Sequence, residues 1–123
     1  MSHKRFIYGM IAASLLLLPV AGSLAKSANE SFLAETIRAM KTMDAGMMAK
    51  PTSDVDQNFV SMMVPHHQGA IDMAVAELRY GHNEQLRRIA QEIIVDQQQE
   101  ITAMRLALGQ PIPPPAPAPT HPN

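Results

Sequence analysis

Apolar residues recur at every third or fourth position along most of this chain, the spacing that gathers side chains on one face of an α-helix. One such stripe covers residues 30 to about 49, a second covers 55 to 80, and a third covers 84 to about 108. The alternating pattern of a half-buried strand is largely missing. The sequence therefore predicts an all-α fold with three helices.

Residues that begin and end helices stand between these stripes. Pro51 ends the first helix, and Asp54 is a good N-cap for the second. Gly81 is expected to end the second helix in a left-handed conformation, and Asn83 is expected to cap the third. Because the loop between them is so short, the second and third helices must form a long antiparallel hairpin. Together with the first helix, this hairpin makes a small helical bundle.

Both ends of the chain differ in composition from the helical part. A short basic start leads into the apolar run FIYGMIAASLLLLPVAGSLA, in which Ser23 and Ala25 place small residues where a signal peptidase cleaves. Residues 1 to 25 are predicted to be a secretory signal peptide, with an uncleaved membrane anchor as the alternative. The proline-rich residues 109 to 123 are predicted to be a disordered tail. This leaves 26 to 108 as the folded domain.

The composition narrows the classes of function. A chain of 123 residues without an internal repeat is enough for one domain. The formal net charge is −1, and no long run of either sign occurs, which argues against binding to nucleic acid or to an anionic membrane. Loss of residues 1 to 25 would remove two of the ten basic residues and bring the net charge to −3. Cysteine is absent, whereas methionine occurs 10 times, so soft-metal chemistry would depend on thioether and imidazole groups.

Polar side chains interrupt the apolar stripes of the hairpin at one level. His66 and His67 lie among apolar positions of the second helix, and Gln97 and Glu100 do the same in the third. With the turn centred near His82, residues whose numbers sum to about 164 should face each other, within three positions, which brings His67 opposite Gln97. One explanation is a buried polar layer in which these groups satisfy each other's hydrogen bonds.

The second explanation is a metal site made of soft and borderline ligands. Met63 precedes His66 by three positions and His67 by four, the spacings that bring side chains together on a helix. A thioether with an imidazole favours Cu(I), and by the same softness Ag(I), over Mg²⁺ or Ca²⁺, while zinc ranks second. Met73 lies two turns beyond His66 and belongs either to the core or to a second site.

The first helix adds a methionine cluster near its end. Four of the eight methionines that follow residue 25 lie within nine residues: Met40, Met43, Met47 and Met48. A methionine stripe can simply fill a core. A flexible turn rich in thioethers could also capture a soft monovalent ion and hand it on, and the sequence leaves both interpretations open.

A family resemblance rests on two helical motifs within residues 54 to 108. The motif positions are Asp56, Phe59, Met63, His66, His67, Gln68, Gly69, Ala70, Ile71, Met73 and Ala74, followed by Ala90, Ile93, Ile94, Gln97, Glu100, Ile101 and Met104. This pattern closely resembles the domain of unknown function 305 family, some of whose members are CopM-like copper-binding metallochaperones of the bacterial periplasm. The resemblance implies a ferritin-like helical bundle that binds Cu(I) and Ag(I). Its candidate ligands are Met63, His66, His67, Met73 and Met104, with Glu100 as a ligand or as the partner of one.

The interpretation from sequence is a periplasmic copper-binding protein, a metallochaperone or buffer that is not an enzyme. No Glu-x-x-His pair of the kind used by di-iron proteins occurs, and no Gly-x-Ser-x-Gly elbow. The expected partners are the metal ion and other periplasmic copper-handling proteins, and neither nucleic acid nor, after signal cleavage, a membrane. A homodimer would complete a four-helix or larger bundle. The alternative is a helical structural or partner-binding module whose methionines form an adaptable contact surface.

Overall fold

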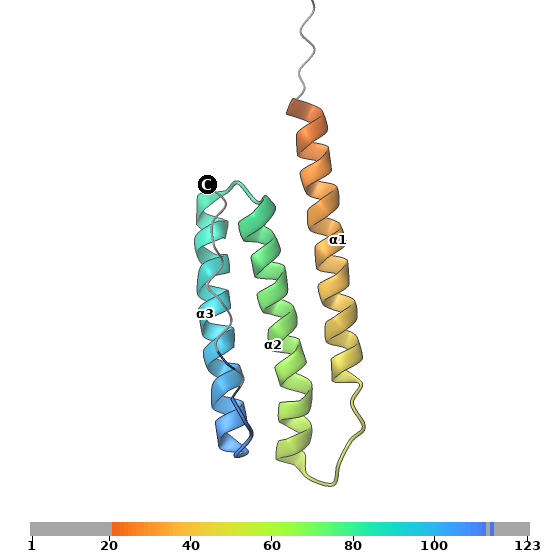
Figure 1. The fold of residues 1–123 in the computed structure, drawn as a ribbon, viewed down its shortest axis with the longest axis vertical. Coiled ribbons are helices and arrows are strands. Elements are labelled where there is room, and N and C mark those ends of the chain that lie inside the picture. Colours follow the sequence, from red (N-terminus) through yellow and green to blue (C-terminus); the bar gives the residue numbers. More distant parts are fainter. Residues whose placement is uncertain (1–20, 113, 115–123) are drawn as a thin grey trace, which may run out of the picture.

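The computed structural model describes residues 21–112 and 114 (Figure 1). Its helices are α1 (Ala21–Met47), α2 (Val55–Tyr80) and α3 (Glu84–Ala107), and the described residues contain no strand. The prediction of a small all-α helical bundle is confirmed. None of the helices in this part of the chain is long and apolar enough to cross a membrane.

The predicted helix bounds agree closely for α2 and α3 and less well for α1. The structure begins α1 at Ala21, well before the predicted start at residue 30. Alanine, leucine and lysine are good helix formers, so residues 21 to 26 continue the helix toward the N-terminus. The predicted cleavage point after Ala25 lies inside α1. The rest of the predicted signal peptide, and most of the predicted tail, lie outside the described residues.

Two N-caps fix where α2 and α3 begin, as predicted. The carboxylate of Asp54 accepts hydrogen bonds from the backbone N–H groups of Asp56 and Gln57, at 2.9 and 3.1 Å. The side-chain oxygen of Asn83 accepts two equivalent bonds at the start of α3, at 2.9 and 3.1 Å. Each cap satisfies backbone donors that have no partner within the helix.

The predicted left-handed ending at Gly81 is wrong. Its backbone is extended, with φ −74° and ψ 150°, and its N–H donates to the carbonyl of Glu77 at 2.8 Å. Glycine fits there for a different reason, because a Cβ on Gly81 would lie 2.7 Å from the backbone oxygen of Glu77. The positive φ in the described residues is at Gly109, just after α3, at 64°.

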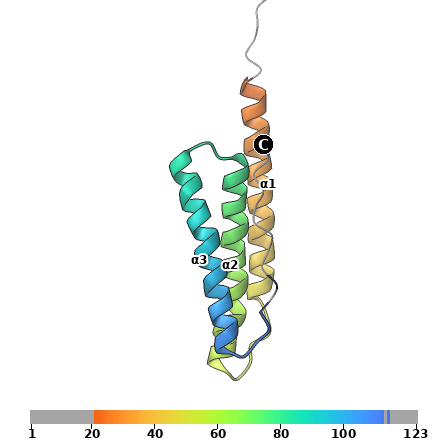
Figure 2. The same ribbon diagram turned by 60° about the vertical axis from the view of Figure 1, so that its left-hand side comes forward.

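The three helices lie in a single layer with α2 in the middle (Figures 1 and 2). Both α1 and α3 run antiparallel to α2 and pack along it, whereas no Cα atom of α1 comes within 8 Å of α3 in the described helices. A layer encloses less volume than a closed bundle. The buried core is correspondingly small, and no large side chain of the described residues is fully buried.

The two helix junctions are built differently. Between α2 and α3 the buried residues are mostly aliphatic: Ile71, Ala74, Ala90, Ile94 and Ile101. Between α1 and α2 the backbones approach closely at two glycines. A Cβ on Gly46 would lie 2.6 Å from the Cβ of Pro65, and one on Gly69 would lie 2.8 Å from the sulfur of Met43. Glycine at these positions allows α1 to lie directly against α2.

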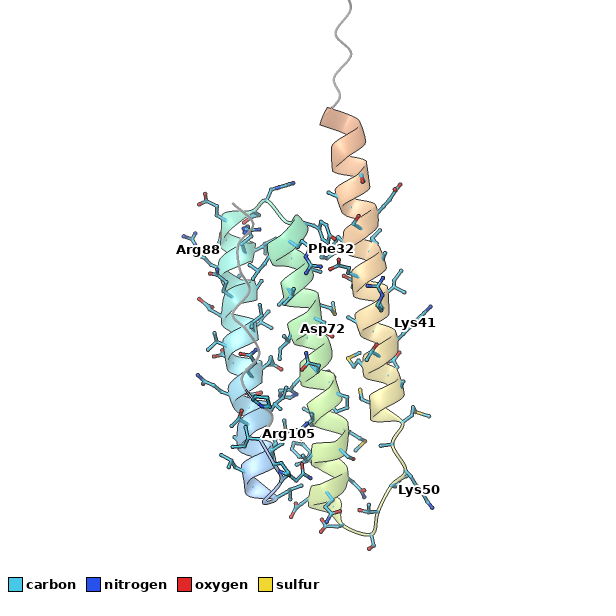
Figure 3. All side chains as sticks on the ribbon, viewed as in Figure 1. Phe32, Lys41, Lys50, Asp72, Arg88 and Arg105 are labelled. Atoms are coloured by element: carbon cyan, nitrogen blue, oxygen red, sulfur yellow. The ribbon has the colours of Figure 1, made fainter. Side chains whose placement is uncertain are left out.

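An ion pair joins α1 to the end of α2. Both carboxylate oxygens of Glu35 lie 2.6 Å from Nη1 of Arg79, and the hydroxyl of Tyr80 donates to Oε1 of Glu35 at 2.8 Å. Phe32, one turn before Glu35, projects toward this end of α2 (Figure 3). The hydrogen bond from Tyr80 lowers the pKa of the Glu35 carboxyl below its usual value. Burial raises this pKa, but the hydrogen bond and the positive charge of Arg79 lower it further.

Replacing Tyr80 with phenylalanine is expected to raise the pKa of Glu35. Because the folded-state pKa of Glu35 is lowered, the interaction stabilises the fold above the unfolded-state pKa and is lost as the pH falls through the folded-state pKa. The pair is partly exposed, so we expect a loss of less than about 1 kcal/mol near neutral pH. NMR titration of the Glu35 side-chain carboxyl in both proteins measures the shift. An unchanged titration midpoint would show that Tyr80 does not bind the carboxylate in solution.

Candidate metal-binding face

One face of α2 carries an exposed row of soft ligands. Met62, His66 and Met73 are separated by four and seven positions, so they lie along the same side of the helix. All three side chains are exposed, Met62 by 43% and Met73 by 38%. The row can therefore be reached by an ion from solvent.

Methionines of α1 lie beside this row. The side chain of Met43 packs on Gly69, which is three positions after His66 and four before Met73. The contact of Gly46 with Pro65 fixes the same antiparallel register. One turn on either side of Met43, this register brings Met47 to the level of His66 and Met40 to the level of Met73. We call these side chains the Met/His stripe; its members are Met40, Met43, Met47, Met62, His66 and Met73.

The fourth methionine of the predicted cluster on α1 is not part of the stripe. Met48 follows the end of α1 and is 84% exposed. Within the stripe, Met43 and Met47 are half-buried and Met40 is 45% exposed. The cluster is therefore divided into packed and open thioethers, which the sequence alone did not separate.

His67 points away from the stripe and is held by two hydrogen bonds. Its ring is buried, with Nδ1 2.7 Å from the backbone oxygen of Met63 and Nε2 2.6 Å from Oε2 of Glu100 on α3. A carbonyl oxygen only accepts, so Nδ1 carries a proton and Nε2 faces the carboxylate. Both ring nitrogens are occupied, and a metal ion could bind Nε2 only by displacing or sharing Glu100.

The two neighbouring histidines thus have different surroundings. Their ring centroids are 5.9 Å apart and their planes meet at 65°, because successive residues on a helix point about 100° apart. His66 is exposed, whereas His67 is 7% exposed. The partner of His67 is Glu100, as the polar-layer interpretation expected for one of the two histidines. Glu100 lies three positions beyond Gln97, the residue that the predicted register placed opposite His67, which is within the expected margin of that register.

A second group of predicted ligands lies between α2 and α3. The pairing of His67 with Glu100 sets the antiparallel register, which brings Met104 opposite Met63. Both methionines are half-buried, and Met104 packs against the aliphatic core. Met63 and Met104 are therefore packed beside the His67–Glu100 pair, whereas most side chains of the Met/His stripe are exposed to solvent.

The donor set fits a soft monovalent ion better than a hard divalent one. Within residues 21–112 and 114, no three His, Cys, Asp or Glu side chains gather where they could hold a metal ion. A site on the Met/His stripe would therefore include thioethers, which prefer Cu(I), rather than the oxygens that Mg²⁺ and Ca²⁺ require.

Met62 is the ligand candidate that the sequence reasoning missed. It precedes His66 by four positions, a spacing as good as that of Met63, and only the structure shows that Met62 shares the exposed face with His66. The spacing was visible in the sequence. The direction of the core, which decides between the two methionines, was not.

One known protein family matches the part of the chain that contains all three helices. A family model described as "Domain of unknown function (DUF305)" matches residues 19–108, which include all of α1, α2 and α3. The chain belongs to the DUF305 family. A search of curated proteins finds no match to it. The Met/His stripe and the His67–Glu100 pair of this DUF305 chain both lie within the matched range.

Proposed function

We propose that this DUF305 protein binds Cu(I), and by the same donor chemistry Ag(I), as a CopM-like periplasmic metallochaperone or buffer for copper tolerance or transfer. The observation that carries the proposal is the Met/His stripe, in which three exposed methionines and one exposed histidine lie beside two half-buried methionines on two adjoining helices. The apolar N-terminal run with its small-residue end supports export to the periplasm.

The stripe suits an ion that must be held and then released. Thioether contacts to Cu(I) come from neutral, polarizable sulfur atoms on flexible side chains. His66 adds the stronger donor in the middle of the row, and Met43, held against Gly69, adds a sulfur in a fixed position. The exposed Met62 and Met73 lie on either side of His66, where they could take over the ion during ligand exchange.

A second candidate function is a helical partner-binding module without metal. It is favoured by the His67–Glu100 pair, which satisfies the buried imidazole without any ion. In that case the methionines of the stripe would serve as an adaptable contact surface. The two functions differ in what His66 does, because a partner surface does not need an imidazole at that position.

Anaerobic titration with Cu(I) against a chromophoric chelator tests the proposal. We expect His66→Ala to lower the Cu(I) affinity by more than about tenfold, since even groups that only orient a metal ligand change affinity on that scale. His82→Ala is the matched control, because His82 is also exposed but lies in the loop between α2 and α3. The Cu(I) affinity of His82→Ala should equal that of the unchanged chain.

The possible results separate the two functions. Competition by the unchanged chain that is lost in His66→Ala and kept in His82→Ala supports a copper site on the stripe. Equal Cu(I) affinity in both variants would show that His66 is not a ligand and that the site lies elsewhere. If the unchanged chain does not compete with the chelator for Cu(I), the copper-binding proposal is wrong. The partner-binding module then becomes the better explanation.

A further inference from the structure

Large apolar side chains gather on the side of the helix layer that carries the Met/His stripe. Each helix contributes exposed residues at helical spacing, and each of these side chains is exposed by between 36% and 53%. We call this surface the apolar face; its central members are Leu33, Met40, Phe59, Met62, Leu86 and Ile93.

The arrangement of the helices explains why these residues share one side. On α2, one edge contacts α1 through Gly69, the other contacts α3 through His67, and Met62 and Phe59 lie between the two. On α1, Leu33 and Met40 lie to one side of Met43, which faces α2. On α3, Leu86 and Ile93 lie to one side of the buried Ala90, and both pairs turn toward the side of the layer that carries Met62. Ile37, Met73 and Ile89 widen the face.

The opposite side of the layer is polar. α2 presents Ser61, Gln68 and Asp72 there, and Gln68 donates to the carboxylate of Asp72 at 2.9 Å. On the outer edge, Lys41 of α1 projects away from α2 (Figure 3). The contrast between the two sides shows that the layer is amphipathic as a whole, with one surface suited to water and the other not.

A helical domain normally buries its apolar surface between two packed layers, and this chain supplies one layer in the part that the structure describes. The three described helices leave the apolar face uncovered. A matching layer supplied by another molecule would bury it.

We propose that a second copy of this chain covers the apolar face in a symmetric dimer. Nine large side chains, each exposed by a third to a half, carry roughly 600 Å² of apolar surface, close to the ~800 Å² that each partner buries in a standard interface. A second copy offers a layer of the same width and apolar pattern, and two-fold dimers are the commonest oligomers. The inference does not depend on copper binding. Met40, Met62 and Met73 belong to both surfaces, so the Met/His stripe is open to solvent in the single chain and would lie at the interface in the dimer.

Sedimentation equilibrium across micromolar concentrations tests the dimer. The chain is expressed with its own N-terminus, purified as the cell processes it, and its first residue is identified by mass spectrometry. Leu86→Glu and Phe59→Glu place a charge on the apolar face, and we expect both to be monomeric where the unchanged chain is dimeric. Leu86 follows Asn83 at the start of α3, where glutamate suits a helix N-terminus, so this change should not weaken the helix.

The matched control is Val95→Glu on the outer side of α3. Val95 and Leu86 are both 51% exposed, but Val95 does not belong to the apolar face. Dimers of the unchanged chain and of Val95→Glu, with monomeric Leu86→Glu and Phe59→Glu of unchanged helicity, would support the proposal. A monomeric unchanged chain would overturn it, and so would a dimer that persists in both face variants. A different protein bound to this face would likewise exclude the second copy as its occupant.

Discussion

Replacing Gly46 with valine is expected to separate α1 from α2 and to lower the free energy of unfolding by about 2–3 kcal/mol. A Cβ at this position would lie 2.6 Å from the Cβ of Pro65, far inside normal contact distance. The proline ring is fixed to the backbone of α2 and cannot rotate away. Since the described part of α1 packs on α2 and not on α3, no other helix would hold α1 in place.

Ala45→Val is the matched control for this prediction. Ala45 is exposed in the same turn of α1, so valine there has the cost of β-branching in a helix without meeting Pro65. Urea unfolding followed by circular dichroism measures both variants, and limited proteolysis of the loop after α1 reports its detachment. Equal stability of the two variants would show that Gly46 is not a packing contact.

Alanine substitution of the two neighbouring histidines is expected to affect different properties: stability for His67 and Cu(I) affinity for His66. His67→Ala removes a buried ring and its bonds to Met63 and Glu100, which should lower the free energy of unfolding by about 2–3 kcal/mol. His66→Ala changes an exposed side chain and should alter stability by less than about 0.5 kcal/mol. Its effect should instead fall on Cu(I) affinity.

Each histidine variant is the control for the other, because both have the same substitution in the same turn of α2. Urea unfolding of the metal-free proteins gives the stability, and Cu(I) competition gives the affinity. Folded His67→Ala should retain most of the affinity, since His67 is already bound to Glu100. If copper binding is lost in His67→Ala and kept in His66→Ala, the site lies between α2 and α3 and not on the Met/His stripe.

Local sequence signals predicted the elements of this fold well. Asp54 and Asn83 cap their helices through side-chain bonds to nearby backbone N–H groups, which depend on a few adjacent residues. The prediction of a left-handed ending at Gly81 was wrong because a glycine can serve two purposes, and here it allows close approach to the backbone oxygen of Glu77. Sequence alone does not tell a glycine needed for its backbone angle from one needed for space.

The candidate site was only partly predictable. The residue types were correct in kind, because a chain without cysteine has thioether and imidazole as its soft donors. Their grouping was not predictable, since it depends on which side of α2 faces α1 and which faces α3. That orientation places Met62 rather than Met63 beside His66 on the open face, and turns His67 toward Glu100.

By itself, the sequence determined that this protein is helical, where α2 and α3 begin and end, and which side chains could bind a soft metal. These properties follow from spacing and capping within one segment of the chain. Only the tertiary structure decided that the helices form a layer, that Met43 lies on Gly69, and that two adjacent histidines have different surroundings. Those outcomes depend on contacts between segments far apart in the chain, where a rotation of one helix by a single residue moves a side chain by about 100° from core to surface.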